Sequence, residues 1–148
     1  MTSRLISVRL AAALALAAGF TAAHADDSAA LAAAAKEPGA VVTGSGLVFR
    51  SLSEGAGASP KASDKVKVNY RGSFPDGTKF DASADHGGPI SFPLNRVIPC
   101  WTEGVQKLKV GGKAKLTCPS AIAYGPNGMG PIPGGATLVF EVELLAIN

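Results

Sequence analysis

Two long segments of this chain alternate strictly between apolar and polar residues, and this pattern limits the possible folds more than any other feature. In residues 65–71, Val66, Val68 and Tyr70 alternate with charged or polar residues, and residues 137–145 show the same period. A period of two places the apolar side chains on one face of a β-strand. Each segment therefore predicts a strand of an antiparallel sheet with one solvated face and one face that another element must cover.

Shorter strand-like segments surround these two. Pro75 and Gly77 predict a hairpin turn before the second of them, because proline presets φ and glycine readily takes a positive φ. The predicted short strands are residues 47–52, 78–81, 90–94 and 113–118.

One segment has the period of a helix. Trp101, Val105 and Leu108 fall at i, i+4 and i+7 and form a single apolar stripe. Pro99 precedes the stripe, and glycines at 111 and 112 follow it, as expected at the two ends of a helix. We therefore predict a helix over residues 101–108 and an α+β fold.

The first 25 residues have the order of a secretory signal peptide. Arg4 and Arg9 form a short positive segment, residues 10–20 are apolar, and small residues lead to Ala25. An apolar run of this length is too short to cross the ~30 Å of a bilayer core as a helix. We expect cleavage after Ala25 and export to the periplasm. An N-terminal buried helix is the alternative.

Cleavage there would leave 148 − 25 = 123 residues, which suits one domain. It would also lower the formal charge from 14 − 11 = +3 to 12 − 11 = +1. A nearly neutral domain gives no reason to expect nucleic acid as a partner. No later segment approaches the ~20 apolar residues of a membrane span, and no cysteine near the cleavage point is placed to carry a lipid, so we expect no membrane anchor.

Residues 26–45 differ from the rest of the mature chain because they are rich in alanine and have no amphipathic stripe. Pro38 and Gly39 would end any helix here. We predict a linker or frayed helix, with the globular domain at residues 46–148. A dimerisation arm is the alternative, and we expect a monomer.

Cys100 and Cys118 are the two cysteines of the chain. In an exported protein such a pair predicts a disulfide, whereas in a cytosolic protein it would more often be two buried thiols. A metal site is poorly supported, since His86 is the only histidine after residue 25 and Cys-x-x-Cys does not occur. We expect neither a metal nor another cofactor.

Conventional catalytic groups are scarce: the sequence shows no Ser/His/Asp set and no glycine-rich phosphate loop that opens a helix. More prominent is a set of aromatic and aliphatic residues spread along the domain, for which a plain hydrophobic core is the alternative interpretation. The set comprises Tyr70, Phe80, Val97, Ile98, Trp101, Tyr124 and Phe140.

Five motifs, in order along residues 46–148, resemble the FKBP-type peptidyl-prolyl cis/trans isomerase family. The resemblance implies a strongly curved antiparallel sheet wrapped around one short helix, with a pocket between them. The motifs are residues 68–72 with 76–83, 97–105 (VIPCWTEGV), 111–116, 123–125 and 132–144.

By resemblance, Trp101 would form the pocket floor and Tyr124 would offer a hydroxyl at its rim. The Ile98 N–H would bind a substrate carbonyl, and Asp81 would lie beside the twisted bond. The resemblance implies catalytic roles for Asp81, Tyr124, Phe80, Ile98 and Phe140, and substrate binding by Tyr70, Ile90, Val97, Trp101 and Ile132.

The chain departs from the family pattern at several positions. His86 stands where an arginine is frequent near the rim, and Ile90 where an aromatic residue is common. Cys100 replaces a glycine and Cys118 an aliphatic residue. Both cysteines lie close to the floor residue, which strengthens the disulfide interpretation.

The resemblance implies an isomerase that acts on X-Pro bonds of exported polypeptides and binds inhibitors of the FK506 and rapamycin type. Rotation about such a bond needs no nucleophile, and an apolar pocket favours the less polar twisted amide. The alternative is a non-catalytic chaperone or peptide-binding module that uses the same groove. The loop at residues 125–135 is too short to hold an inserted chaperone domain, which favours the isomerase.

Overall fold

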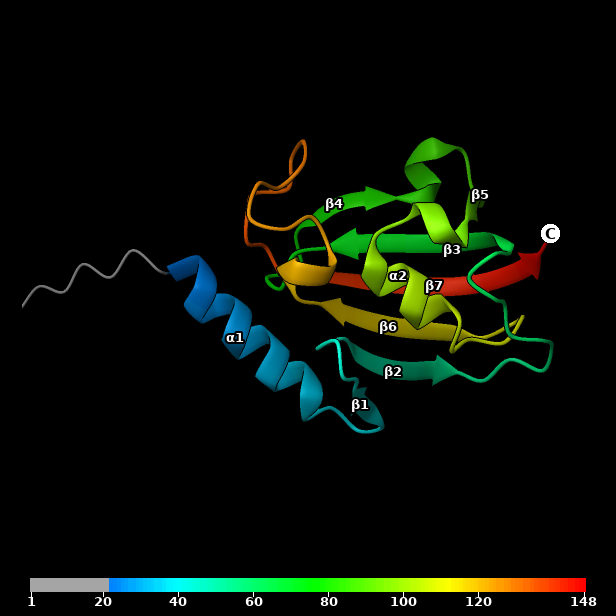
Figure 1. The fold of residues 1–148 in the computed structure, drawn as a ribbon, viewed down its shortest axis with the longest axis horizontal. Helices are drawn as coiled ribbons and strands as arrows, with labels where there is room; N and C mark the ends of the chain where they lie inside the picture. Colours follow the sequence, from blue (N-terminus) through cyan, green and yellow to red (C-terminus); the bar gives the residue numbers. More distant parts are fainter. Residues whose placement is uncertain (1–21) are drawn as a thin grey trace, which may run out of the picture.

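The computed structural model describes residues 22–148, which form one seven-stranded antiparallel sheet with few helices (Figure 1). Residues 1–21, which hold most of the predicted signal peptide, lie outside the described residues. The strands run in the order β1-β2-β6-β7-β3-β4, and β5 also pairs with β3. They are β1 (Ala40–Val42), β2 (Val48–Ser53), β3 (Lys65–Ser73), β4 (Lys79–Ala82), β5 (Ile90–Pro93), β6 (Lys113–Cys118) and β7 (Leu138–Ile147).

The two strictly alternating segments became the long central strands β3 and β7, which pair from Val66↔Ile147 to Ser73↔Val139. Their apolar residues face the core, where Val66, Val68, Val142 and Leu144 have no exposed surface. The charged residues between them lie on the opposite, solvated face. The prediction of one covered and one wet face is confirmed for β3 and β7, where Lys67 and Glu141 are exposed.

Helix α2 (Pro99–Val105) covers the apolar face of the sheet. Proline occupies its first turn, and hydrogen-bonded turns after Val105 carry the chain on to Leu108. The predicted stripe is buried as expected, although the helix begins and ends earlier than residues 101–108. A Cβ atom at Gly104 would lie 2.8 Å from both methyl carbons of Leu116, so glycine allows α2 to approach β6 this closely.

A disulfide between Cys100 and Cys118 joins α2 to the last residue of β6, with the two Cα atoms 6.0 Å apart. Both cysteines are fully buried. Cys100 directly precedes Trp101 in the chain. The predicted pairing is confirmed, and it links the helix to the sheet beside the residue expected to form the pocket floor.

The outer edge of β3 is shared by two short strands. β5 pairs with Lys65–Val68, and β4 pairs with Arg71–Ser73, which leaves an interruption at Asn69 and Tyr70. A 3₁₀ turn at Ser83–His86 fills it, and the Ser83 hydroxyl accepts a hydrogen bond from the Tyr70 backbone N–H at 3.0 Å. The turn therefore takes the place of a strand at this point of the edge.

Residues 26–45, for which we predicted a linker or frayed helix, contact the sheet. Helix α1 (Ala22–Ala35) lies over the face opposite α2, and β1 pairs with β2. Between them, the Glu37 carboxylate pairs with Lys115 and Arg50, each at 2.7 Å. The hydrogen bond from Lys115, then its charge and that of Arg50, outweigh partial burial and lower the pKa of Glu37. No helix of residues 22–148 is long and apolar enough to span a membrane.

Candidate active site

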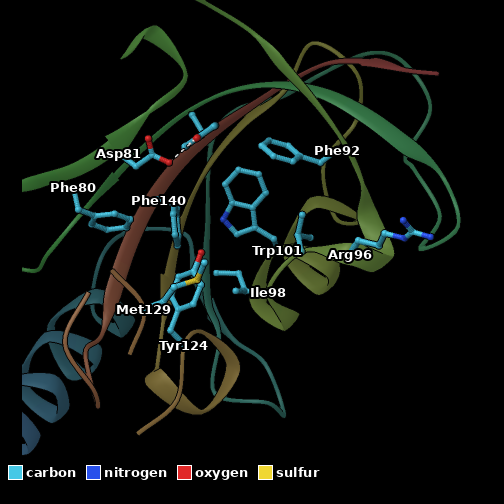
Figure 2. Close-up of a pocket in the computed structure, with 11 residues that line it drawn as sticks. Phe80, Asp81, Phe92, Arg96, Ile98, Trp101, Tyr124, Met129 and Phe140 are labelled. Carbon is cyan, nitrogen blue, oxygen red and sulfur yellow. Dashed lines mark hydrogen bonds between the residues drawn. The ribbon is translucent and has the colours of Figure 1, made fainter. Parts of the chain in front are cut away.

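A cavity of about 440 Å³ lies between the concave face of the sheet and the start of α2 (Figure 2). Its walls come from β3, β4, β5 and β7, from the turn before α2, and from the loop that precedes β7. Most of its lining is apolar, with polar atoms at the margins. The lining residues are Tyr70, Phe80, Asp81, Phe92, Arg96, Val97, Ile98, Trp101, Tyr124, Met129 and Phe140.

Trp101 forms the floor of this cavity and is only 5% exposed. Three aromatic rings meet its indole edge to face: Tyr70 at 5.2 Å, Phe92 at 5.7 Å and Phe140 at 5.4 Å between centroids. Edge-to-face pairs at these separations are favourable because the positive ring edge meets the negative face of the neighbour. The floor is therefore held from three sides by side chains of three strands.

Phe80 extends the aromatic wall on the side away from Phe92 (Figure 2). Its ring meets Phe140 edge to face with centroids 5.6 Å apart, and it also contacts Phe74. Gly72 on β3 leaves the space for these rings, since a Cβ there would lie 2.6 Å from Phe80 and 2.9 Å from Phe140. A side chain at this position would push the wall into the cavity.

Asp81 supplies the one carboxylate of the lining. The Tyr70 hydroxyl donates to its Oδ2 at 2.7 Å, and His86 Nε2 lies 2.8 Å from its Oδ1. Burial acts to raise the pKa of Asp81, but the hydrogen bonds from Tyr70 and His86 outweigh it and hold this pKa below its ordinary value. The side chain is half-buried and remains ionised at neutral pH. His86, at the position where the family frequently has an arginine, thus pairs with Asp81.

Two groups can donate hydrogen bonds at the cavity margin. Burial, and then the charge of Asp81, raise the pKa of Tyr124, so its hydroxyl keeps its proton at neutral pH. The backbone of Ile98 precedes α2, and among the described residues nothing accepts a hydrogen bond from its N–H. Its carbonyl, by contrast, accepts from Trp101 and Thr102 within the helix.

The structure brings most of the predicted site residues together around one cavity. Asp81, Tyr124, Phe80, Ile98, Phe140, Tyr70, Val97 and Trp101 all line it.

Two predicted residues are not part of the lining. Ile132 is buried in the core. Ile90 lies on β5, where it pairs with Val68 of β3, and it does not line the cavity. Phe92, two residues further along β5, lines the cavity instead. Alternation along β5 places Phe92 and Ile90 on the same face and so does not distinguish them.

Sequence reasoning also missed Arg96 and Met129, which lie at the cavity mouth. Arg96 belongs to a 3₁₀ turn at Leu94–Arg96, and its guanidinium points away from the cavity (Figure 2). No sequence signal marks either residue, because each joins the site only through the path of a loop. Within residues 22–148, no cluster of three or more metal-ligating side chains occurs.

Comparison with known proteins agrees with this geometry. Residues 57–145 match the family described as FKBP-type peptidyl-prolyl cis-trans isomerase. FkpA, an isomerase of this type from Aeromonas hydrophila, is 58% identical over 118 residues, which are 80% of this chain and 44% of that protein. The chain thus spans less than half the length of this relative.

Solved structures are similar over most of the chain. The crystal structure of FkpA from Escherichia coli has a TM-score of 0.83 and 45% identity, and covers 85% of this chain and 59% of its own. A peptidyl-prolyl cis-trans isomerase from Pseudomonas syringae has a TM-score of 0.79 and 37% identity, and covers 86% and 94%. With the motifs, the fold and the cavity in agreement, the chain belongs to the FKBP-type peptidyl-prolyl cis-trans isomerase family.

Proposed function

We propose that this protein is a peptidyl-prolyl cis/trans isomerase that accelerates rotation about X-Pro bonds in polypeptide substrates. The observation that carries the proposal is the cavity itself, an aromatic socket floored by Trp101 with the Ile98 N–H and the Tyr124 hydroxyl at its margin. Such a site suits a reaction in which no covalent bond is made or broken.

The chemistry requires only that the rotated amide be favoured over the planar one. The uncatalysed barrier is about 18–20 kcal/mol because rotation sacrifices amide resonance. The twisted amide is less polar than the planar ground state. A water-poor aromatic cavity therefore stabilises the twisted amide more than the planar one, and this lowers the barrier to rotation. We assign the proline ring to the space above Trp101, bordered by Phe140 and Phe80.

The donors at the margin would hold the substrate while its bond turns. The Ile98 N–H, which has no acceptor among the described residues, is available to a substrate carbonyl. The Tyr124 hydroxyl, kept protonated, would bind a second carbonyl further along the peptide. Fixing the flanking chain converts binding energy into orientation of the rotating bond. We place the ionised Asp81 carboxylate beside that bond, where its charge acts on the amide dipole.

We further propose that the protein acts in the periplasm on exported polypeptides, as a monomer. The N-terminal sequence supports export, and the buried Cys100–Cys118 disulfide suits an oxidising compartment. We also propose that FK506-type macrolides occupy the same cavity and compete with substrate.

A proline-limited refolding assay, with and without such a macrolide, tests these proposals. We expect the wild-type protein to accelerate refolding, and the macrolide to abolish the acceleration. Tyr124→Phe combined with Phe140→Ala should lower kcat/KM at least about tenfold, because it removes one donor and one wall. Lys107→Ala, at an exposed position in the turn after α2, is the matched control and should retain full activity. Suppression of aggregation without acceleration would instead support a non-catalytic chaperone.

A further inference from the structure

Met129 combines exposure with a place in the apolar cavity. Its side chain is 64% exposed, yet it lines the cavity mouth on the same side as Tyr124 (Figure 2). Single exposed apolar residues are common on protein surfaces, and Val41 and Val42 are similarly exposed. Met129 differs from them because it lines the apolar cavity. A peptide seated on Trp101 would leave the cavity past this residue.

The backbone at Met129 is held in position although the side chain is free. Met129 and Ile132 exchange two hydrogen bonds, each 2.9 Å long, and Ile132 is buried in the core. Gly128 and Gly130 on either side both have positive φ, at 69° and 53°. A Cβ at Gly128 would collide with the Ile132 carbonyl oxygen. The loop therefore presents the thioether at a defined place on the rim.

Met129 also carries the one sulfur of the mature sequence that is open to oxidants. The chain has two methionines and two cysteines, and Met1 belongs to the predicted signal peptide. Cys100 and Cys118 are already joined, and both are fully buried. In an oxidising compartment a thioether exposed in this way is a natural target for hydroperoxides.

We propose that Met129 is a substrate contact whose reversible oxidation by a hydroperoxide lowers isomerase activity. The inference rests on the proposed function. In the reaction, a sulfur lone pair attacks one peroxide oxygen, the O–O bond breaks and an S–O bond forms. The other oxygen leaves as an alkoxide, or as hydroxide from hydrogen peroxide, and takes the proton of the transferred oxygen to become an alcohol or water. The thioether loses two electrons, and the peroxide gains them.

The sulfoxide would change the cavity mouth from apolar to polar. Its oxygen is a strong hydrogen-bond acceptor, and a substrate residue packed against it would strip its water without offering a donor. For a peptide with an apolar residue before proline, we expect kcat/KM to fall about three- to tenfold, the factor that corresponds to losing a small buried apolar contact. The fold should not change, because Met129 is largely exposed and is not part of the hydrophobic core.

The test uses the mature protein and two variants, Met129→Leu and Met129→Gln. Leucine keeps an apolar side chain without sulfur, and glutamine places a permanent carbonyl at the rim. Each protein is treated with hydrogen peroxide, checked by mass spectrometry for one added oxygen, and assayed with the same apolar peptide. A methionine sulfoxide reductase is then added. Thermal unfolding before and after treatment reports on the fold.

We expect treated wild-type protein to lose activity with an unchanged unfolding transition, and the reductase to restore it. The ratio of treated to untreated activity of Met129→Leu should stay at one, and Met129→Gln should resemble oxidised wild type without treatment. Full activity in wild-type protein that carries the oxygen on Met129 would overturn the inference.

The untreated protein tests the proposed isomerase separately. If untreated protein fails to isomerise the peptide, the proposed function fails, and peptide affinity measured by titration before and after oxidation then decides the role of Met129. Unchanged affinity in that case would overturn the inference as well.

Discussion

Breaking the Cys100–Cys118 disulfide should destabilise the protein strongly while leaving its folded site largely intact. The bond joins the start of α2 to the end of β6 and lies next to the floor residue Trp101. Trp101 does not depend on the bond alone, because rings from three strands also hold it. Stability and activity should therefore respond differently to the same change.

The expected magnitude follows from the length of chain that the bond closes. The two cysteines are 18 positions apart. The chain-entropy relation for a loop of this size gives about 3 kcal/mol at 25 °C, mostly through restriction of the unfolded state. For a domain of this size that loss corresponds to a fall in Tm of roughly 10–15 °C. It is a large part of the ~5–15 kcal/mol by which typical domains are stable.

Urea unfolding of three samples separates the cross-link from packing. They are oxidised wild-type protein, wild-type protein reduced before unfolding, and the double variant Cys100→Ala, Cys118→Ala. Reduced wild type keeps both sulfur atoms, so its difference from the oxidised sample measures the bond alone, and the double variant adds the loss of two buried sulfurs. We expect the reduced sample to lose about 3 kcal/mol and, at a temperature where it is folded, to keep kcat/KM within a factor of about three. A loss below about 1 kcal/mol in reduced wild type would refute the loop-closure argument.

Three further changes test other parts of the structure. Tyr70→Phe removes a donor to Asp81, so the lowered pKa of that carboxyl should rise toward its ordinary value, as NMR titration would show; an unmoved pKa would contradict this assignment. A lowered pKa stabilises the fold above about pH 4, and this contribution disappears as the pH falls through the folded-state pKa. The variant should therefore lose more stability at pH 7 than in acid. Gly104→Ala should lower the free energy of unfolding in urea by about 1–3 kcal/mol, because the new methyl group would clash with Leu116. This loss should exceed the ~1 kcal/mol that alanine contributes over glycine in a helix. A net gain in stability would refute the close approach of α2 to the sheet. Glu37→Gln should change the global free energy of unfolding by less than about 1 kcal/mol, since its two ion pairs are partly exposed. It should nevertheless speed amide hydrogen exchange in β1. Equal exchange rates in the variant and the wild type would show that these ion pairs do not hold this segment.

Local patterns in the sequence were sufficient for the central elements. Alternation along 65–71 and 137–145 defines which faces of β3 and β7 are buried, since each side chain's face follows from its neighbour's. Pro75 and Gly77 likewise specify the hairpin turn, and Gly77 has the expected positive φ of 92°. The helix stripe was also correct, although its ends shifted because capping depends on Pro99 and on packing against β6.

Elements whose stability comes from partners distant in the chain were harder to predict from the sequence. Alanine-rich residues 26–45 carry no periodic signal, so neither β1 nor the contact of α1 with the sheet was predicted. Glu37 holds this region through two basic residues that lie on other strands. A segment that packs weakly by itself is ordered by such long-range pairs, which no local window of sequence contains.

In the candidate site, too, some features followed from local sequence patterns and others depended on tertiary packing. The sequence by itself determined the socket's chemical character through Tyr70, Trp101 and Phe140, because they lie on strands and a helix whose faces are set by local period. Family resemblance added most of the remaining lining. Only the tertiary structure decided that Phe92 rather than Ile90 reaches Trp101, and that Met129 lies at the mouth. Membership of a cavity depends on how strands curve and where loops return, and these are set by packing between segments far apart in the chain.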